Sequence, residues 1–171
     1  LYTVGDQHLK AVFGLGNIGK DYVLTRHNAG FLCIDQLVEE LGGSWKEKKS
    51  LKSFVAEVRL GDKRLLCVKP TTLMNLSGDA AAAVKQFYKL DNKSILVIHD
   101  ELDMPFGTLR LRLDGGSAGH NGIKSVSSAI GEDYARLRVG VKNNQTPKTE
   151  AANFVLKPFT KTEQASFPAL Y

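Results

Sequence analysis

The amino-acid sequence predicts a single three-layer α/β domain. Strand patterns and helical patterns follow one another along the chain, and this order is typical of a sheet covered by helices. The length of 171 residues suits one domain with a proper core. We assign residues 9–171 to this domain and residues 1–8 to a short N-terminal extension.

Six stretches of the sequence have strand patterns. Ile95 to Ile98 are all apolar, as expected of a central strand that is covered on both faces. Residues 54–69 form a hairpin pattern with Gly61 and Asp62 at its turn. The six predicted strands are 10–14, 54–60, 64–69, 94–99, 107–113 and 135–141.

Helical patterns separate these strands. Asn28 is a plausible N-cap of the first helix and Gly42 its stop signal. A last helix is predicted near Thr160, because Thr160 and Glu163 match a capping box. The three earlier helices are predicted at 28–41, 78–89 and 121–130.

Composition and charge are those of an ordinary soluble globular protein, with 43% hydrophobic and 24% charged residues. A net charge of +5 tolerates a polyanionic partner but does not require one. No apolar run is long enough to span a bilayer. Cys33 and Cys67 lie in apolar runs and are expected to be buried thiols in a reducing cytosol. We therefore expect a cytoplasmic protein with no membrane partner, and a monomer.

Gly14, Gly16 and Gly19 match the spacing G-x-G-x-x-G after a short apolar run. A dinucleotide-binding turn needs a helix that begins at the glycines and a second strand that ends in an acid roughly 20 residues on. Here the helical pattern begins only near Asn28, and Asp35 lies inside that helix. We therefore expect a tight turn rather than an NAD site.

Polar side chains follow three of the predicted strands. Asn17 and His27 come after the first strand, Asn75 after the third and Asp100 after the fourth. If these strands are parallel, their carboxyl ends share one edge of the sheet, where α/β proteins bind ligands. A histidine, a carboxylate and two amides at one cleft are the groups of a site that uses a general base.

The glycine-rich segment at 114–125 places His120 and Asn121 at another helix start. Asn121 could serve as an N-cap and nothing more, and the glycines could form only a flexible connector. The residues alone leave these interpretations open beside a role in the cleft.

Two strand patterns carry a pair of arginines on their polar face, Arg110 with Arg112 and Arg136 with Arg138. A solvated strand face is the ordinary explanation for such pairs. The first pair, however, leads directly into the glycine-rich segment, and arginines beside a polar cleft suit a phosphate.

Four segments together resemble bacterial-type peptidyl-tRNA hydrolases: "FGLGNIGKDYVLTRHNAG", "KPTTLMNLSG", "HDELDMPFGTLRLRLDGGSAGHNGIKS" and "RLRVGV". The resemblance extends from about residue 9 to about residue 159. It implies a single α/β domain with a mixed, twisted sheet flanked by helices, in agreement with the predicted layout. It also implies hydrolysis, without cofactor or metal, of the ester that joins a peptide to tRNA, with peptidyl-tRNA as the partner.

The resemblance also implies roles for individual residues. Those matched to catalysis are His27, Asp100 and Asn17. Those matched to substrate binding are Tyr22, Met74, Asn75, His120 and Asn121. Those matched to the tRNA 5′-phosphate region are Arg112 and Arg138.

Two departures from the family pattern are visible. Ile18 stands where the family usually has proline, so we expect a less rigid turn and a more loosely held Asn17. Pro168 would interrupt the last predicted helix.

Three other classes remain open from the residues: a nucleotide-binding oxidoreductase, an RNA-binding domain without activity, and a metal-dependent hydrolase. The metal interpretation rests on His99, Asp100, Glu101 and His120, whose spacing matches no recognised metal motif.

Overall fold

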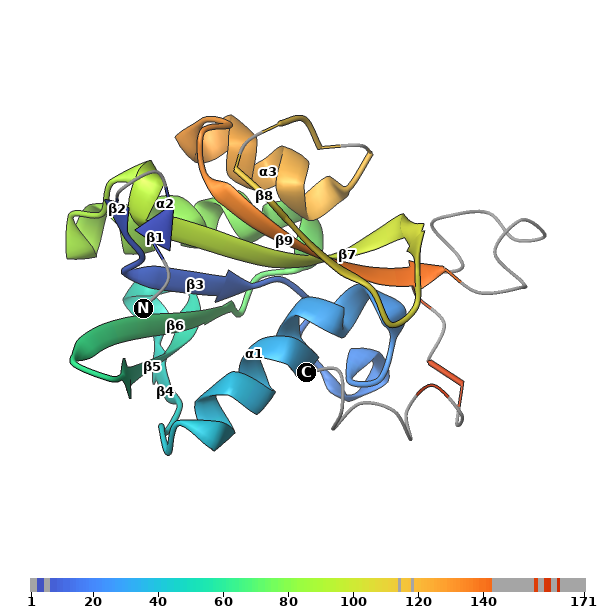
Figure 1. Cartoon of the computed structure of the whole chain (residues 1–171), viewed down its shortest axis with the longest axis horizontal. Helices are drawn as coiled ribbons and strands as arrows, with labels where there is room; N and C mark the ends of the chain where they lie inside the picture. The colour runs from blue at the N-terminus through green and yellow to red at the C-terminus, as the bar shows by residue number, and fades with distance from the viewer. Residues whose placement is uncertain are drawn as a thin grey trace.

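A computed structural model of the chain describes residues 3–4, 7–113, 115–117, 119–142, 156, 159–160 and 163. The strands of its main sheet are β3 (Ala11–Gly14), β4 (Lys46–Lys48), β5 (Ser53–Leu60), β6 (Lys63–Pro70), β7 (Ile95–Pro105), β8 (Leu109–Arg112) and β9 (Ala135–Lys142). They lie in the order β4–β5–β6–β3–β7–β9–β8 (Figure 1). β6, β3, β7 and β9 are parallel neighbours, whereas β5 and β8 run antiparallel to theirs. The sheet is therefore mixed, as predicted.

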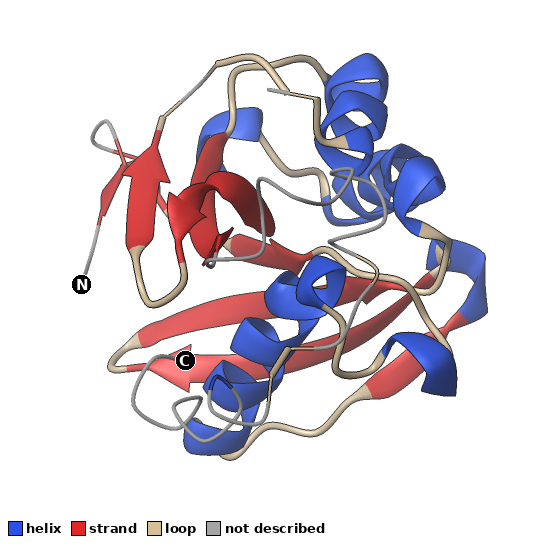
Figure 2. Ribbon diagram, turned by 90° about the vertical axis from the view of Figure 1, so that its right-hand side faces the viewer, coloured by secondary structure: helices blue, strands red, loops and turns tan. Residues whose placement is uncertain are grey.

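Helices cover both faces of this sheet (Figure 2). α1 (Ala29–Glu40) lies on one face, and α2 (Ser77–Tyr88) and α3 (Asn121–Ile130) lie on the other. Phe13 and Val97 belong to the core that α2 and α3 close, whereas Val12 and Ile98 belong to the core that α1 closes. Alternate residues of the central strands thus face opposite layers, and the predicted three-layer α/β domain is confirmed.

Short helical turns complete the fold at the ends of the strands. They are η1 (Lys20–Tyr22), η2 (Arg26–Asn28), η3 (Lys49–Leu51), η4 (Met74–Leu76) and η5 (Asn92–Ser94). η1 and η2 separate the glycine turn from α1, so the helix does not begin at the glycines. Asp35 lies inside α1 and pairs with Lys69 at 2.6 Å. It is therefore not the acid at the end of a second strand that a dinucleotide-binding turn needs, in agreement with the predicted tight turn.

The predicted strands and helices correspond to the observed ones, with three differences. β7 continues to Pro105 through an irregularity after Glu101, beyond the predicted end at residue 99. β4 was not predicted, because a short run of charged residues has no apolar alternation. The two-residue strands β1 (Thr3–Val4) and β2 (Gln7–His8), which pair with each other, were also not predicted, because two residues are too few to show an alternation.

The predicted capping box forms at the C-terminal side of the chain. The Thr160 backbone N–H donates to Glu163 Oε1 at 2.8 Å, and the Glu163 N–H donates to Thr160 Oγ1 at 3.1 Å. Glu163 also pairs with Arg26 of η2 at 3.4 Å. The rest of the predicted helix, with Pro168, lies outside the described residues.

Cys33 and Cys67 are both free thiols. Burial raises the pKa of Cys33 to about 11 and that of Cys67 to about 12, so neither is a reactive thiolate at neutral pH.

Among the helices described, none has the length and apolar character needed to cross a bilayer.

Gly30 lets α1 approach the backbone of the sheet. A Cβ at this position would collide with the Ile98 carbonyl oxygen and with the Leu15 backbone nitrogen, neither of which can move away. Gly30→Ala should therefore lower the free energy of unfolding by about 1–3 kcal/mol, although alanine is the better helix former. Urea denaturation measures the change. In the control Gly116→Ala the added methyl group meets no atom, and a comparable loss there would contradict the explanation.

Candidate active site

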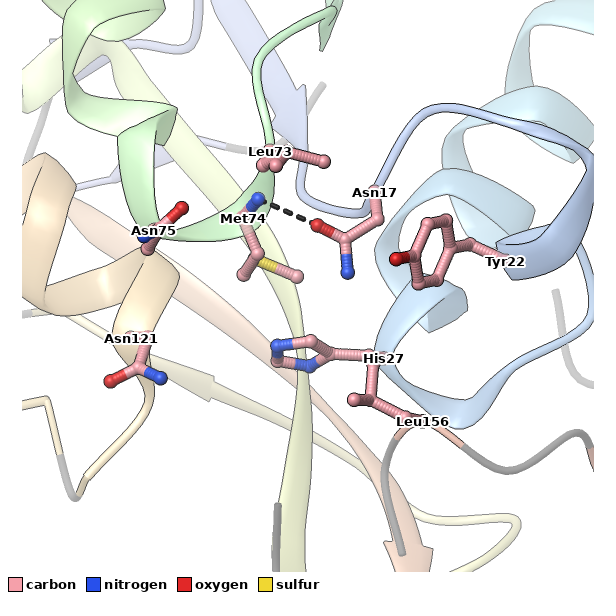
Figure 3. A pocket seen from close by; sticks show the side chains of 8 residues that line it. All are labelled: Asn17, Tyr22, His27, Leu73, Met74, Asn75, Asn121 and Leu156. Carbon is pink, nitrogen blue, oxygen red and sulfur yellow. Dashed lines mark hydrogen bonds between the residues drawn. The ribbon is translucent and has the colours of Figure 1, made fainter. Parts of the chain in front are cut away.

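A cleft of about 290 Å³ opens where β3 and β6 end and α3 begins. Figure 3 shows His27 directed into it, with amide side chains on either side. Its walls are formed by Asn17, Tyr22, His27, Leu73, Met74, Asn75, Asn121 and Leu156. Six of the residues predicted for catalysis or substrate binding thus lie around one cavity.

The carboxylate of Asp100 is shared by two histidine rings. His27 Nδ1 lies 2.9 Å from both Asp100 oxygens, and His120 Nε2 lies 2.7 Å from Oδ1. His27 belongs to η2, Asp100 to β7, and His120 precedes α3. Three elements therefore meet at one buried carboxylate, whose side chain is 2% exposed.

Asp100 is charged at neutral pH. Burial opposes that charge, but the attraction and hydrogen bonds of His120 and His27 outweigh burial and hold the pKa of Asp100 well below its usual range. A carboxylate only accepts hydrogen bonds, so His27 must carry a proton on Nδ1. In the neutral ring, Nε2 of His27 is then bare and can take a proton from a group in the cleft.

His120 is oriented by a second hydrogen bond. Its Nδ1 accepts the Ile123 backbone N–H at 3.2 Å, which makes His120 the N-cap of α3. Its Nε2 therefore carries the proton that it donates to Asp100. His120 does not line the cleft, so the expectation that it binds substrate is not supported by its position. It joins the start of α3 to Asp100 instead.

Asn121 is the first residue of α3, so the N-cap role that the sequence left open for it belongs to His120. The Asn121 side chain is exposed and lines the cleft, as does that of Asn75. Tyr22 and Met74 line it as well. Figure 3 shows Asn75 and Asn121 on one side of His27, with Asn17 and Tyr22 on the other.

Asn17 is fixed by three hydrogen bonds. Its backbone N–H donates to Asn28 Oδ1 at 2.8 Å, and Asn28 Nδ2 donates to its carbonyl oxygen at 2.9 Å. Its side-chain Oδ1 accepts the Met74 N–H at 2.7 Å, which leaves its amide NH₂ group for the cleft. Asn28 and Met74 thus hold Asn17 in place, and the effect of Ile18 on the rigidity of the turn stays a prediction. Asn28 itself makes no side-chain capping bond to α1, contrary to prediction.

His99, next to Asp100, is buried and neutral. Burial, and next the charge of His120, lower the pKa of His99 to about 3. Its Nδ1 donates to the Asp100 carbonyl oxygen at 2.8 Å, and its ring meets that of His120 edge-on, 4.9 Å between centroids. His99 therefore supports the backbone and ring that hold Asp100.

Arginines lie on β8 and β9, the two strands at the edge of the sheet next to β7. Arg138 of β9 stands directly opposite Arg110 of β8, and Arg112 opposite Arg136. Like charges at directly opposed positions are destabilising unless an anion lies between them. Arg138 pairs with Glu101 at 3.4 Å through Nη1, and its buried Nε has no hydrogen-bond partner among the described residues.

Arg136 does not belong to an exposed arginine pair, although the alternation predicts one. It is 2% exposed and donates to the backbone carbonyls of Gly116 and Glu132. It thus joins the glycine-rich segment to the loop that follows α3, whereas Arg110 and Arg112 are exposed.

Within the described part of the chain, the one group of acidic, histidine or cysteine side chains that could hold a metal is His27, Asp100 and His120. Their ligand atoms are already joined by hydrogen bonds of 2.7–2.9 Å. Of the ligand set considered from the sequence, only Asp100 and His120 belong to this group.

The family model described as peptidyl-tRNA hydrolase matches residues 11–171. The chain belongs to the peptidyl-tRNA hydrolase family. The resemblance found in the sequence is thereby confirmed.

Individual members of the family give the degree of similarity. A peptidyl-tRNA hydrolase of Frankia casuarinae is 46% identical over 160 residues, which cover 93% of the chain and 80% of that protein. One of Aliarcobacter butzleri is 46% identical over 152 residues, or 89% and 80% of the two chains. The crystal structure of peptidyl-tRNA hydrolase from Acinetobacter baumannii, 31% identical, superposes with a TM-score of 0.88 over 99% of the chain and 84% of its own.

Asn28 contacts a site residue but was given no site role by the sequence. Asn28 was read as a helix cap because asparagine is common at that position, and its bond to Asn17 became visible only in three dimensions. Arg110 was paired with Arg112 as a candidate for phosphate from the alternation of the strand, and its position opposite Arg138 became visible only with the pairing of β8 and β9.

Acid should destabilise the fold in part through His99. Because its pKa is about 3 in the fold and about 6.5 when unfolded, the unfolded chain binds a proton first as the pH falls below about 6.5. This titration should cost up to about 1.4 kcal/mol per pH unit. In His99→Asn, which keeps an N–H donor for the Asp100 carbonyl, the free energy of unfolding should depend less steeply on pH between 6.5 and 4.5. Equal slopes for both proteins in urea titrations would contradict a buried neutral His99.

Proposed function

We propose that the protein hydrolyses the ester between a peptide and the 3′ end of tRNA, and so returns tRNA stranded by aborted translation. The observation that carries this proposal is His27, whose Nδ1 is tied to the Asp100 carboxylate while its other nitrogen faces a cleft rich in amides. Family membership supports the substrate class. Such a substrate places the activity in the cytoplasm.

His27 acts as the general base in the proposed reaction. Its Nε2 removes a proton from water while the water oxygen attacks the ester carbonyl carbon. Asp100 accepts the Nδ1–H bond throughout, so it fixes the tautomer and balances the imidazolium that forms. The tetrahedral intermediate then expels the ribose oxygen, which takes the proton back from His27. The products are a peptide with a free carboxyl group and a tRNA with a free ribose hydroxyl.

Amides of the cleft bind the groups around the reacting ester. Asn75 is the proposed donor to the oxygen that becomes negative, and removal of such a donor typically costs about 2.7–4 kcal/mol of transition-state stabilisation. Asn17 presents its NH₂ group beside His27 because Met74 and Asn28 bind its other polar atoms. Asn121, Tyr22 and Met74 bound the space for the peptide and the tRNA end. Amides bind backbone groups, so many peptide sequences are accepted.

The arginines of β8 and β9 bind the tRNA phosphates in this proposal. The partly exposed side chain of Arg138 and the exposed Arg110 opposite it support an anion at this place. Arg112 extends the same face. Phosphate contacts are independent of sequence and sensitive to salt, which fits an enzyme that acts on many tRNAs.

Replacement of the general base gives the most direct test. His27→Ala should reduce turnover of an N-acetylaminoacyl-tRNA by about 10²–10⁴-fold, with little change in tRNA affinity or in melting temperature. Release of the labelled amino acid, with and without EDTA, measures the effect. Normal turnover by His27→Ala would refute the mechanism, and loss of wild-type activity in EDTA would favour a metal-dependent hydrolase. Binding without release would leave an RNA-binding domain.

The phosphate role of Arg138 can be tested apart from the chemistry. Arg138→Ala should raise the KM for an N-acetylaminoacyl-tRNA. A plot of log KM against log salt concentration should also have a smaller slope for this variant, because one phosphate contact is lost. A minimal N-acetylaminoacyl ester of adenosine should be turned over as before. Arg59→Ala, on the distant strand β5, serves as the charge-matched control. Equal losses on both substrates in Arg138→Ala would show that Arg138 does not bind phosphate.

A further inference from the structure

A second cavity, of about 220 Å³, lies on the other side of the glycine turn. Asn17 lines both the active-site cleft and this second pocket, so the two cavities are adjacent, with Asn17 between them. Its wall is built mainly from the apolar side chains of Ile18, Val23, Phe31 and Phe54. Ile18 and Val23 are 40% and 52% exposed, so part of this apolar wall is open to a ligand.

The charged pair in this pocket is satisfied internally. Lys69 bonds to Asp35 at 2.6 Å, and its ammonium group lies 4.6–5.8 Å from the ring centres of Trp45, Phe31 and Phe54. Lys69 is therefore held in place by a carboxylate and by cation–π contacts. Its pairing leaves the apolar side chains, with the exposed Lys20 beside them, as the groups that the pocket offers to a ligand.

The strand order gives the direction in which a substrate lies. Arg110 and Arg138 are on β8 and β9, Asp100 is on β7, and Asn17 follows β3. The second pocket comes next in the same order, because Lys69 near the end of β6 pairs with Phe54 near the start of β5. In Figure 1, β8 and β9 lie on one side of β3 and β7, and β5 and β6 lie on the other side. With tRNA phosphates on the arginines and the ester at His27, the peptide continues toward β6 and β5.

We propose that the second pocket binds an apolar side chain of the peptide, from a residue upstream of the one esterified to tRNA. This inference rests on the proposed function. The esterified residue lies beside His27 in the first cleft. A chain has to pass Asn17 to reach the second pocket, so only a residue further from the ester can fill it. The enzyme thus accepts many peptides but cleaves faster those with an apolar side chain at that position.

The test uses tRNAs that carry N-acetyl-tetraglycine, or the same peptide with one phenylalanine placed at each upstream position in turn. The wild-type kcat/KM should be about fivefold to tenfold higher for one of the phenylalanine-containing substrates than for the tetraglycine substrate. N-acetylglycyl-tRNA is the reference, since it is too short to reach the pocket. Failure to cleave this reference would refute the proposed function. Cleavage of the reference without a preference of at least twofold at any position would refute the pocket alone.

Two adjacent variants distinguish the pocket from its surroundings. Val23→Glu places a charge in the pocket wall. In this variant the ratio of kcat/KM for the phenylalanine substrate to that for the tetraglycine substrate should fall to about 1, so the preference is lost. Leu24→Glu is the matched control, because Leu24 is 41% exposed and lies outside both cavities. It should keep the preference of the wild type. A preference that survives Val23→Glu, or that Leu24→Glu removes equally, would overturn the assignment.

Discussion

One buried carboxylate determines how this site is arranged. Asp100 accepts hydrogen bonds from His27 on the α1 side of the sheet and from His120 at the start of α3. Because it is ionised, it fixes the proton on one nitrogen of each ring. The other nitrogen of His120 is bound to the α3 backbone, so only His27 has one directed to the cleft. Loss of the Asp100 charge would release both rings and the Asn121 end of α3.

A second constraint acts at the glycine turn. Gly14 and Gly30 let α1 approach β3 and β7 so closely that a methyl group on either would meet backbone atoms. This approach brings Asn28 against Asn17, where the Asn28 side chain makes two hydrogen bonds with the Asn17 backbone. Backbone packing at the core therefore determines which way an amide points in the cleft.

The fold and most of the site follow from sequence patterns, for identifiable reasons. Apolar periodicity located the helices and the long strands, and the strand-end rule brought Asn17, His27, Asn75 and Asp100 to one edge. What failed depended on pairing between distant segments. The alternation at Arg136 predicted exposure, but carbonyls of the neighbouring loop bury it. His120 and Asn121 were adjacent candidates for a cap, and only the position of Asp100 decides between them. The charged strand β4 has no apolar pattern of its own.

The Arg26–Glu163 pair has a consequence for protein synthesis. It joins residues 137 positions apart, and it anchors the turn that contains His27. A ribosome that makes this chain completes the His27 turn, Asp100 and His120 well before Glu163 leaves its exit tunnel. Until then the growing chain is itself esterified to tRNA. The anchor of the His27 turn thus becomes available only after the residues that form the catalytic group have all been synthesised.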